Sequence, residues 1–227
     1  MEFKYWFTLI FLGAIWGSAF IFIKVAAPEF GAIGLVQARL TIASLVFLPV
    51  LLQSKYLKLL KFAWKHSLIL AITNNAIPFT LFSFGSFGAD SNILAILNST
   101  TAFNTMIIAY IWLKESITSK QVFGLIIGFI GVIILVNPES STTSIFSAIL
   151  CLIGAACYSF STVFIQKNSN KIDKLVLIGW SIIFSVFIMM PITFFNLPET
   201  MPSTNAFLSA FWLGSVSTGL AFFGYVY

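Results

Sequence analysis

The stretch that decides the fold of this chain is residues 5–26, YWFTLIFLGAIWGSAFIFIKVA, in which Lys24 is the one charged residue. As an α-helix these residues rise about 33 Å, enough to cross a hydrocarbon layer about 30 Å thick. The apolar core of a secretory signal peptide is shorter, about 7–15 residues. We therefore interpret the stretch as a retained membrane-spanning helix, the first of several.

The composition of the whole chain indicates that lipid surrounds it. Of its 227 residues, 59% are hydrophobic and 8% are charged, and the mean hydropathy is +1.01. Soluble domains carry about 25% charged residues, so this chain cannot cover a water-exposed surface. The net charge of +5 comes without a block of basic residues. Nucleic acid is therefore excluded as a partner, and a lipid bilayer is expected.

Eight apolar runs have the length of a membrane-spanning helix. Their predicted bounds are 5–26, 31–52, 67–88, 92–113, 120–137, 144–166, 173–195 and 206–227. The breaks between them include Pro28-Glu29, Lys55–Lys65 and Asn137–Glu139, and Thr118 with Gln121 is a predicted capping box. Runs of this length fit helices rather than barrel strands, so the predicted fold class is all-α, a polytopic membrane helix bundle.

The basic residues indicate which side of the membrane each loop faces. If the runs alternate in direction, ten of the twelve basic residues share one side: Lys4, Lys55, Lys58, Lys61, Lys65, Lys114, Lys120, Lys167, Lys171 and Lys174. The opposite loops carry Glu29, Asp90, Glu139 and Glu199 and no Lys or Arg. Because cytoplasmic loops are enriched in basic residues, we expect a cytoplasmic N-terminus in the inner membrane of a bacterial-type cell.

An internal repeat is predicted at an offset of 141 residues. The offset aligns Gly13-Ala14 with Gly154-Ala155, and it matches the bounds of the first three runs to those of the sixth to eighth. A five-helix unit used twice enters the membrane from opposite sides, which gives the inverted repeat found in transporters. We expect a first unit over residues 5–137 and a second, incomplete unit over 144–227.

The repeat also predicts that the chain stops early. A second unit of five helices would end at about residue 278 if it repeated the first. The sequence ends instead in an apolar aromatic run at Tyr227. We expect that two further helices are missing, through truncation of the record or of the gene.

Arg39 is the residue that most strongly indicates function. It lies about 12 Å from the end of the second run and so close to the membrane midplane. No Asp or Glu lies at a similar depth in the predicted runs, so the guanidinium needs another acceptor. Helix carbonyls and Asn side chains would give it a structural role. The functional alternative is a bidentate clamp for an anionic substrate group such as a carboxylate.

Uncharged polar and aromatic side chains at comparable depth complete the predicted substrate site. They are Asn74, Asn75, Asn98, Thr101, Asn104 and Tyr158, together with Trp16, which lies inside a run and not at an interface. Asparagine is unfavourable in lipid and is expected to face the bundle interior. Such groups also bind neighbouring helices, by about 1 kcal/mol each, so a purely structural role stays open. The spacings Gly13/Gly17 and Gly124/Gly128 predict close helix packing.

The sequence offers little for catalysis. The one histidine, His66, lies at a predicted membrane edge, and neither Cys151 nor Cys157 is near it in sequence. No GxSxG, HExxH or phosphate-binding loop occurs. We expect no enzyme activity, and we predict no catalytic residue, cofactor or metal site.

Several short segments resemble the EamA-type transporters of the drug/metabolite transporter superfamily. They are Ile15-Trp16-Gly17-Ser18, Ala38-Arg39-Leu40, Leu113-Lys114-Glu115 and Gly124 to Val132. The resemblance implies ten helices in two inverted bundles around a cavity that opens alternately to each side. It also implies that Arg39 and Glu115 match residue types that are usual in the family. Ala102 and Lys114 depart from it, since the family usually has Pro and Gly there.

These observations favour a secondary transporter that moves a small metabolite by alternating access. The predicted Arg39 clamp suits a carboxylate-bearing substrate such as an amino acid. The alternative is a non-transporting membrane protein, either an enzyme of lipid chemistry or a non-functional fragment. The identity of the substrate and the oligomeric state do not follow from the sequence.

The predicted orientation can be tested by cysteine labelling in intact cells. Single cysteines placed near residues 60, 117 and 170 are expected to resist an impermeant thiol reagent, because these loops carry the basic residues. A cysteine at position 90 serves as the accessible control. Ready labelling near residues 60, 117 and 170 would reject the orientation.

Overall fold

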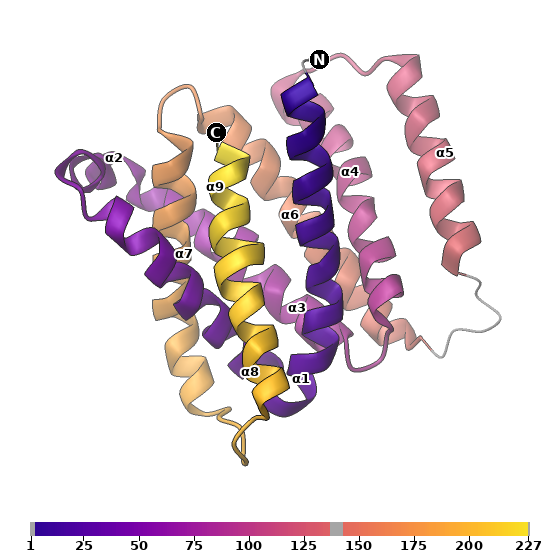
Figure 1. Cartoon of the computed structure of the whole chain (residues 1–227). Helices are drawn as coiled ribbons and strands as arrows, with labels where there is room; N and C mark the ends of the chain where they lie inside the picture. The colour runs from indigo at the N-terminus through magenta and orange to yellow at the C-terminus, as the bar shows by residue number, and fades with distance from the viewer. Residues whose placement is uncertain (1–2, 137–142, 227) are drawn as a thin grey trace.

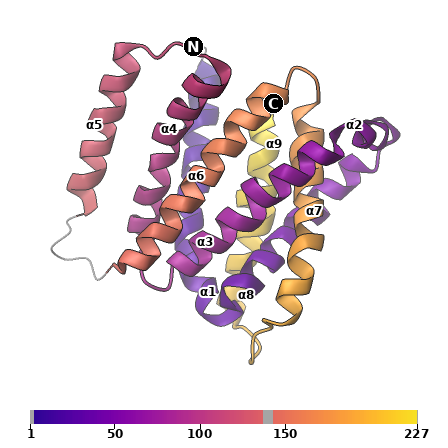
Figure 2. The same cartoon turned by 180° about the vertical axis from the view of Figure 1, so that it is seen from behind.

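The computed structural model describes residues 3–136 and 143–226, with all side chains there except those of 3–5, 7, 129 and 131–136. These residues form a bundle of helices, and the described part contains no strand. The helices are α1 (Phe3–Leu51), α2 (Ser54–Leu70), η1 (Ala71–Ala76), α3 (Ile77–Gly85), α4 (Ser91–Leu113), α5 (Ser119–Val136), α6 (Ile145–Asn168), α7 (Lys174–Phe194), α8 (Thr204–Phe211), η2 (Trp212–Leu220) and α9 (Ala221–Val226). Figures 1 and 2 show α5 at one edge, beside α4. The predicted break Asn137–Glu139 and Tyr227 lie outside the described residues.

The helices confirm a polytopic membrane bundle. Among the described residues, six helices are long and apolar enough to cross a membrane: Thr8–Leu51, Ser54–Gly85, Ser91–Leu113, Ile145–Asn168, Lys174–Phe194 and Thr204–Val226. The first has 44 residues and holds two of the predicted runs. The helix α5 covers the predicted run 120–137 up to Val136, and its capping box is confirmed, with the Thr118 N–H donating to Gln121 Oε1 at 2.9 Å.

The first two crossings are separated by a sharp bend rather than by a loop. Helical hydrogen bonding continues past Pro28 and Glu29, where a break was predicted, and the chain turns at Gly31, which has φ +70° and ψ 158°. Glycine adopts this conformation without the steric cost that a side chain brings. We refer to residues 3–30 and 32–51 as the first and second crossings.

The third crossing begins earlier than predicted. The lysine-rich stretch 54–66 is helical as part of α2, although the sequence predicted a loop there. Its Lys, Leu, Tyr and Trp residues are compatible with a helix, and the stretch contains no Gly or Pro that would end one. Its lysines are exposed, while Ala63, Ser67 and Leu70 are buried against the bundle.

The third and eighth crossings each contain a π-helical segment. In the third, η1 joins α2 to α3, and in the eighth, η2 joins α8 to α9. The two segments begin at Ala71 and Trp212, which are 141 residues apart. A π-helical turn leaves the regular hydrogen-bonding pattern and often occurs at functional sites.

Helices of one predicted unit pack against helices of the other. The third packs against α6 and α7, and the eighth packs against α1. Close approach depends on small residues: a Cβ at Gly214 would lie 2.8 Å from the Arg39 carbonyl oxygen. At Gly13, Gly17, Gly124 and Gly128, an added Cβ would meet no described atom within 4 Å, so the described part of the chain does not show the close packing predicted from those spacings.

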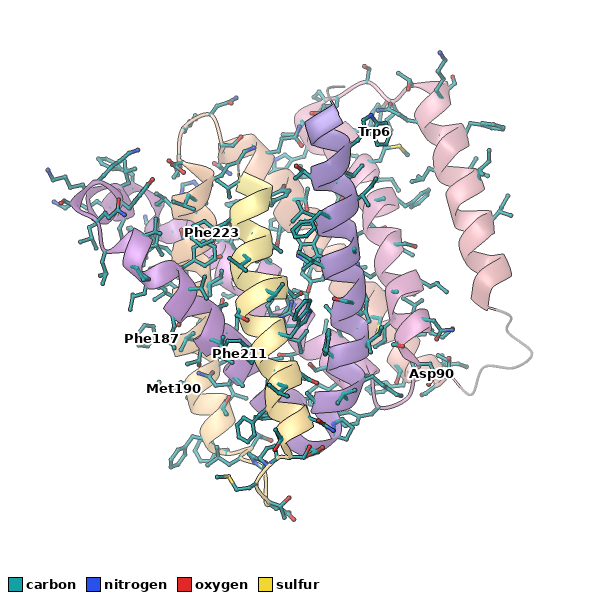
Figure 3. The ribbon with its side chains drawn as sticks, viewed as in Figure 1. Trp6, Asp90, Phe187, Met190, Phe211 and Phe223 are labelled. Carbon is teal, nitrogen blue, oxygen red and sulfur yellow. The ribbon has the colours of Figure 1, made fainter. Side chains whose placement is uncertain are left out.

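The outer surface of the bundle is apolar. Phe187, Met190 and Phe211 project away from the helices and are 64%, 53% and 59% exposed (Figure 3). Such side chains along α7 and the eighth crossing are typical of a lipid-facing surface. Polar side chains gather inside the bundle instead.

Candidate functional site

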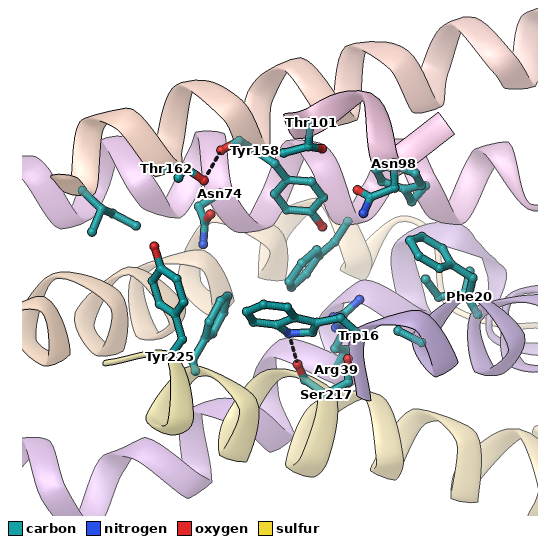
Figure 4. A pocket seen from close by; sticks show the side chains of 16 residues that line it. Trp16, Phe20, Arg39, Asn74, Asn98, Thr101, Tyr158, Thr162, Ser217 and Tyr225 are labelled. Carbon is teal, nitrogen blue, oxygen red and sulfur yellow. Dashed lines mark hydrogen bonds between the residues drawn. The ribbon is translucent and has the colours of Figure 1, made fainter. Parts of the chain in front are cut away.

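A cavity of about 240 Å³ lies inside the bundle, between the predicted units. Its wall is built by the first and second crossings, the third crossing (α2, η1 and α3), α4, α6 and the eighth crossing (α8, η2 and α9) (Figure 4). Six of the eight predicted site residues line it: Trp16, Arg39, Asn74, Asn98, Thr101 and Tyr158. These residues lie far apart in the sequence, and the fold brings them to one place.

Arg39 is the charged group of this cavity and is 7% exposed. Its Nε–H donates to Thr218 Oγ1 at 2.7 Å, and its Cζ lies 3.7 Å from the ring centroid of Phe79. Among the described residues, the structure records no salt bridge to it. A buried guanidinium without a carboxylate is costly unless its remaining N–H groups find acceptors. The remaining N–H groups of Arg39 therefore need acceptors, and the described residues provide none that is recorded.

The segment η2 binds both crossings of α1 through consecutive residues. The Trp16 Nε1–H donates to the Ser217 carbonyl oxygen at 3.1 Å, and Thr218 accepts from Arg39. Thr218 Oγ1 itself donates to the Leu213 carbonyl oxygen at 2.8 Å, five residues back. The π-helical geometry thus places two residues of the eighth crossing against opposite sides of the α1 bend.

Several polar atoms on the cavity wall have no partner. Asn98 Oδ1, Thr101 Oγ1 and Ser217 Oγ are buried and make no hydrogen bond within the described part of the chain. Buried polar atoms are usually hydrogen-bonded, and these three have almost no accessible surface, so a side chain has to move before a ligand or water can reach them.

Two predicted site residues do not line the cavity. Asn75 is fully buried behind it, and its Nδ2 donates to Ser181 Oγ at 3.0 Å and Ser185 Oγ at 3.1 Å. Asn104 is half-buried on α4 and is not among the residues that line the cavity. The geometry gives Asn75 the helix-binding role that the sequence had left open.

Much of the cavity wall is aromatic, and sequence reasoning missed most of it. The aromatic wall residues are Trp16, Phe20, Phe79, Phe82, Tyr158, Phe222 and Tyr225. Tyr158 stacks on Phe82 with 5.9 Å between ring centroids. Thr162 and Ser217 were also missed, because a hydroxyl in a membrane helix commonly bonds to its own backbone. With 26 phenylalanines in the chain, nothing in their spacing separates wall residues from lipid-facing ones.

On the side of Phe20 and Phe82, polar contacts and aromatic packing join the first crossing to α3 and the connection that follows it. Lys24 Nζ donates to the carbonyl oxygens of Ser86 at 2.8 Å and Ala89 at 3.0 Å, and it lies 3.7 Å from Asp90 Oδ1. Phe20 and Phe82 meet nearby, with 5.6 Å between ring centroids. The wall extends in the other direction to Tyr225, near the end of α9.

Glu115, which the family resemblance singled out, lies outside this cavity. It follows the end of α4, where Lys114 has a left-handed conformation with φ +59°. Gln166 Nε2 donates to Glu115 Oε1 at 2.7 Å. Glu115 is exposed, and this contact ties the α4–α5 connection to the end of α6.

The fold and cavity define a polytopic membrane protein with an internal polar site. The model of the EamA-like transporter family matches residues 4–137, more than half of the chain. The chain belongs to the EamA-like transporter family, which confirms the resemblance stated above. It is therefore a member of a family of integral multi-pass membrane transporters.

Relatives that carry the name transporter match along most of the chain. An uncharacterized transporter of Archaeoglobus fulgidus is 24% identical over 231 residues, covering 99% of this chain and 80% of the relative. One of Buchnera aphidicola subsp. Schizaphis graminum is 28% identical, covering 91% of the chain and 71% of the relative. The uncharacterized transporter YvbV of Bacillus subtilis is 24% identical, with coverage of 80% and 60%.

A solved crystal structure has the same fold. It superposes with a TM-score of 0.64 at 14% sequence identity, covering 94% of this chain and 77% of the solved one. At this identity the likeness concerns the fold and not the substrate.

The different positions of Asn75 and Asn98 lead to a test. Asn75→Ala is expected to lower the free energy of unfolding by about 1–3 kcal/mol, because it removes the buried hydrogen bonds of Asn75 with Asn74, Ser181 and Ser185. Asn98→Ala is the matched control and should be near neutral, since it removes an unpaired polar atom. Thermal unfolding of both variants in detergent measures the difference. Equal losses of stability would contradict the assignment of Asn98 to the cavity and Asn75 to packing.

Proposed function

We propose that this protein is a secondary transporter that moves a small carboxylate-bearing metabolite across the inner membrane by alternating access. The observation that carries the proposal is Arg39, a buried guanidinium on a cavity wall. Among the described residues it has one recorded hydrogen bond, one ring contact and no carboxylate partner. A carboxylate matches the fork of N–H donors that guanidinium offers.

The cavity suits a small substrate with an apolar body. Its volume of about 240 Å³ lies below the usual 300–1,000 Å³ of drug-sized sites. The aromatic wall provides apolar contact, and the side chains of Asn74 and Asn98 add neutral polar groups to the same wall. An amino acid or an organic acid of similar size has this chemistry.

The hydrogen bonds of Lys24 and Glu29 near one end of the cavity support alternating access. Besides the Lys24 contacts, the Ser203 backbone N–H and hydroxyl both donate to the Glu29 carboxylate, and the hydroxyl lies 2.8 Å from it. These two hydrogen bonds join the α1 bend to the start of α8. If the N-terminus is cytoplasmic, these hydrogen bonds close the cavity toward the outer side of the membrane. Hydrogen bonds between loops and helix ends can break and re-form as the cavity opens on that side.

The two π-helical segments support an inverted repeat. They begin 141 residues apart, which is the offset that the sequence comparison gives. The third crossing packs against α6 and α7, and the eighth packs against α1. This reciprocal packing also fits two units related by a two-fold axis. Alternating access then arises when one unit rocks against the other around the shared cavity.

Substitution of Arg39 tests the proposal. Arg39→Leu is expected to abolish carboxylate uptake in proteoliposomes while insertion and yield stay at wild-type levels, since it removes the anion-binding group. Arg39→Lys keeps the charge but loses the planar fork, so weaker uptake is expected. Lys171→Met, at an exposed lysine outside the cavity, is the matched control for a lost positive charge.

Stability separates the structural alternative from the functional one. A substrate-binding Arg39 leaves the empty Arg39→Leu variant as stable as wild type or more stable, because a partly paired buried charge has been removed. A structural Arg39 makes that variant less stable. Wild-type uptake by well-expressed Arg39→Leu would end the proposal.

A further inference from the structure

Contacts with the segment η2 determine which N–H groups of Arg39 remain free to bind a substrate. We propose that Thr218 is a positioning residue for Arg39, and that a bound anion is held end-on by the two Nη nitrogens of the guanidinium. This inference rests on the proposed function, because it assumes that Arg39 is the anion-binding group. It goes further in naming the donors that remain free and the residue that selects them.

The direction of the Thr218 hydroxyl proton is fixed by the π-helix. A threonine hydroxyl has one proton and two acceptor lone pairs. In an α-helix it commonly donates to the carbonyl three or four residues back. Here it donates to Leu213, five residues back, at 2.8 Å. Its lone pairs are then left to accept from Arg39 Nε, at 2.7 Å, in a site where Thr218 is fully buried.

The remaining geometry of the guanidinium follows from these contacts. Arginine has one N–H on Nε and four on the Nη nitrogens. Nε–H is taken by Thr218, and Phe79 covers one face of the group at 3.7 Å from Cζ. No described residue is recorded as a partner of the Nη atoms. A side-on carboxylate would need Nε–H, so the end-on pair of Nη donors is the fork that is left.

The inference is testable because Arg39 is the only arginine in the sequence. Labelling with [15N]arginine gives one Nε–H signal in the NMR spectrum of the protein in lipid nanodiscs. We expect Thr218→Val to shift this signal and to speed exchange of the Nε proton with water about tenfold or more, as the loss of a hydrogen bond to a charged group implies. Thr218→Ser keeps the hydroxyl and should retain the wild-type signal.

Thr101→Val is the matched control, because Thr101 lines the same cavity but makes no recorded contact with Arg39. It should leave the Nε–H signal and its exchange rate unchanged. An unchanged Nε–H signal in folded Thr218→Val would overturn the positioning role. If Thr218→Val does not fold, loss of the wild-type signal in Thr218→Ser would overturn it as well.

Sodium benzoate, an aromatic carboxylate, is the probe for the end-on site. Its addition should move the Nη–H signals and leave Nε–H at its wild-type position. Movement of Nε–H to the Thr218→Val position would mean that the anion displaces Thr218, which overturns end-on binding. No movement of any Arg39 signal would overturn the anion site too. Failure of the proposed function itself is seen separately, as unimpaired uptake by Arg39→Leu.

Discussion

Hydrocarbon offers no hydrogen bonds, and this constraint accounts for the buried positions of Arg39, Asn74 and Asn75. Lipid cannot solvate an unpaired donor, so each costs several kcal/mol there, and polar side chains turn inward. Arg39 is the strictest case because its charge is permanent. The bundle holds it between Thr218 and Phe79 on the wall of a cavity. Its position links the second and eighth crossings, one from each predicted unit.

The bundle departs from regular helix geometry at its two π-helical segments, where backbone carbonyl groups accept hydrogen bonds from other crossings. In η1 the Ala71 carbonyl oxygen accepts from Ser185 Oγ at 3.0 Å, and in η2 the Ser217 carbonyl oxygen accepts from Trp16 Nε1. Both contacts join crossings from different predicted units. The irregular backbone therefore binds the units together next to the cavity, where buried protein groups satisfy it.

Hydropathy predicted the crossings well, because a bilayer demands long apolar runs and the basic loops mark their ends. It failed at residues 54–66, where a helix continues into a polar stretch, and at Gly31, where a bend replaces a loop. Depth and polarity also predicted six of the cavity residues. Asn75 could not be told from Asn74, since the two are adjacent and only packing against Ser181 and Ser185 separates their roles.

The central claim is that the cavity at Arg39 binds the transported anion. An electron cryomicroscopy structure of the protein in lipid nanodiscs, with a transported carboxylate bound, tests it most directly. The account predicts ligand density between Trp16 and Tyr158, with its carboxylate within hydrogen-bonding distance of the Arg39 guanidinium. Ligand bound elsewhere with this cavity empty, or an Arg39 side chain turned toward lipid, would contradict it.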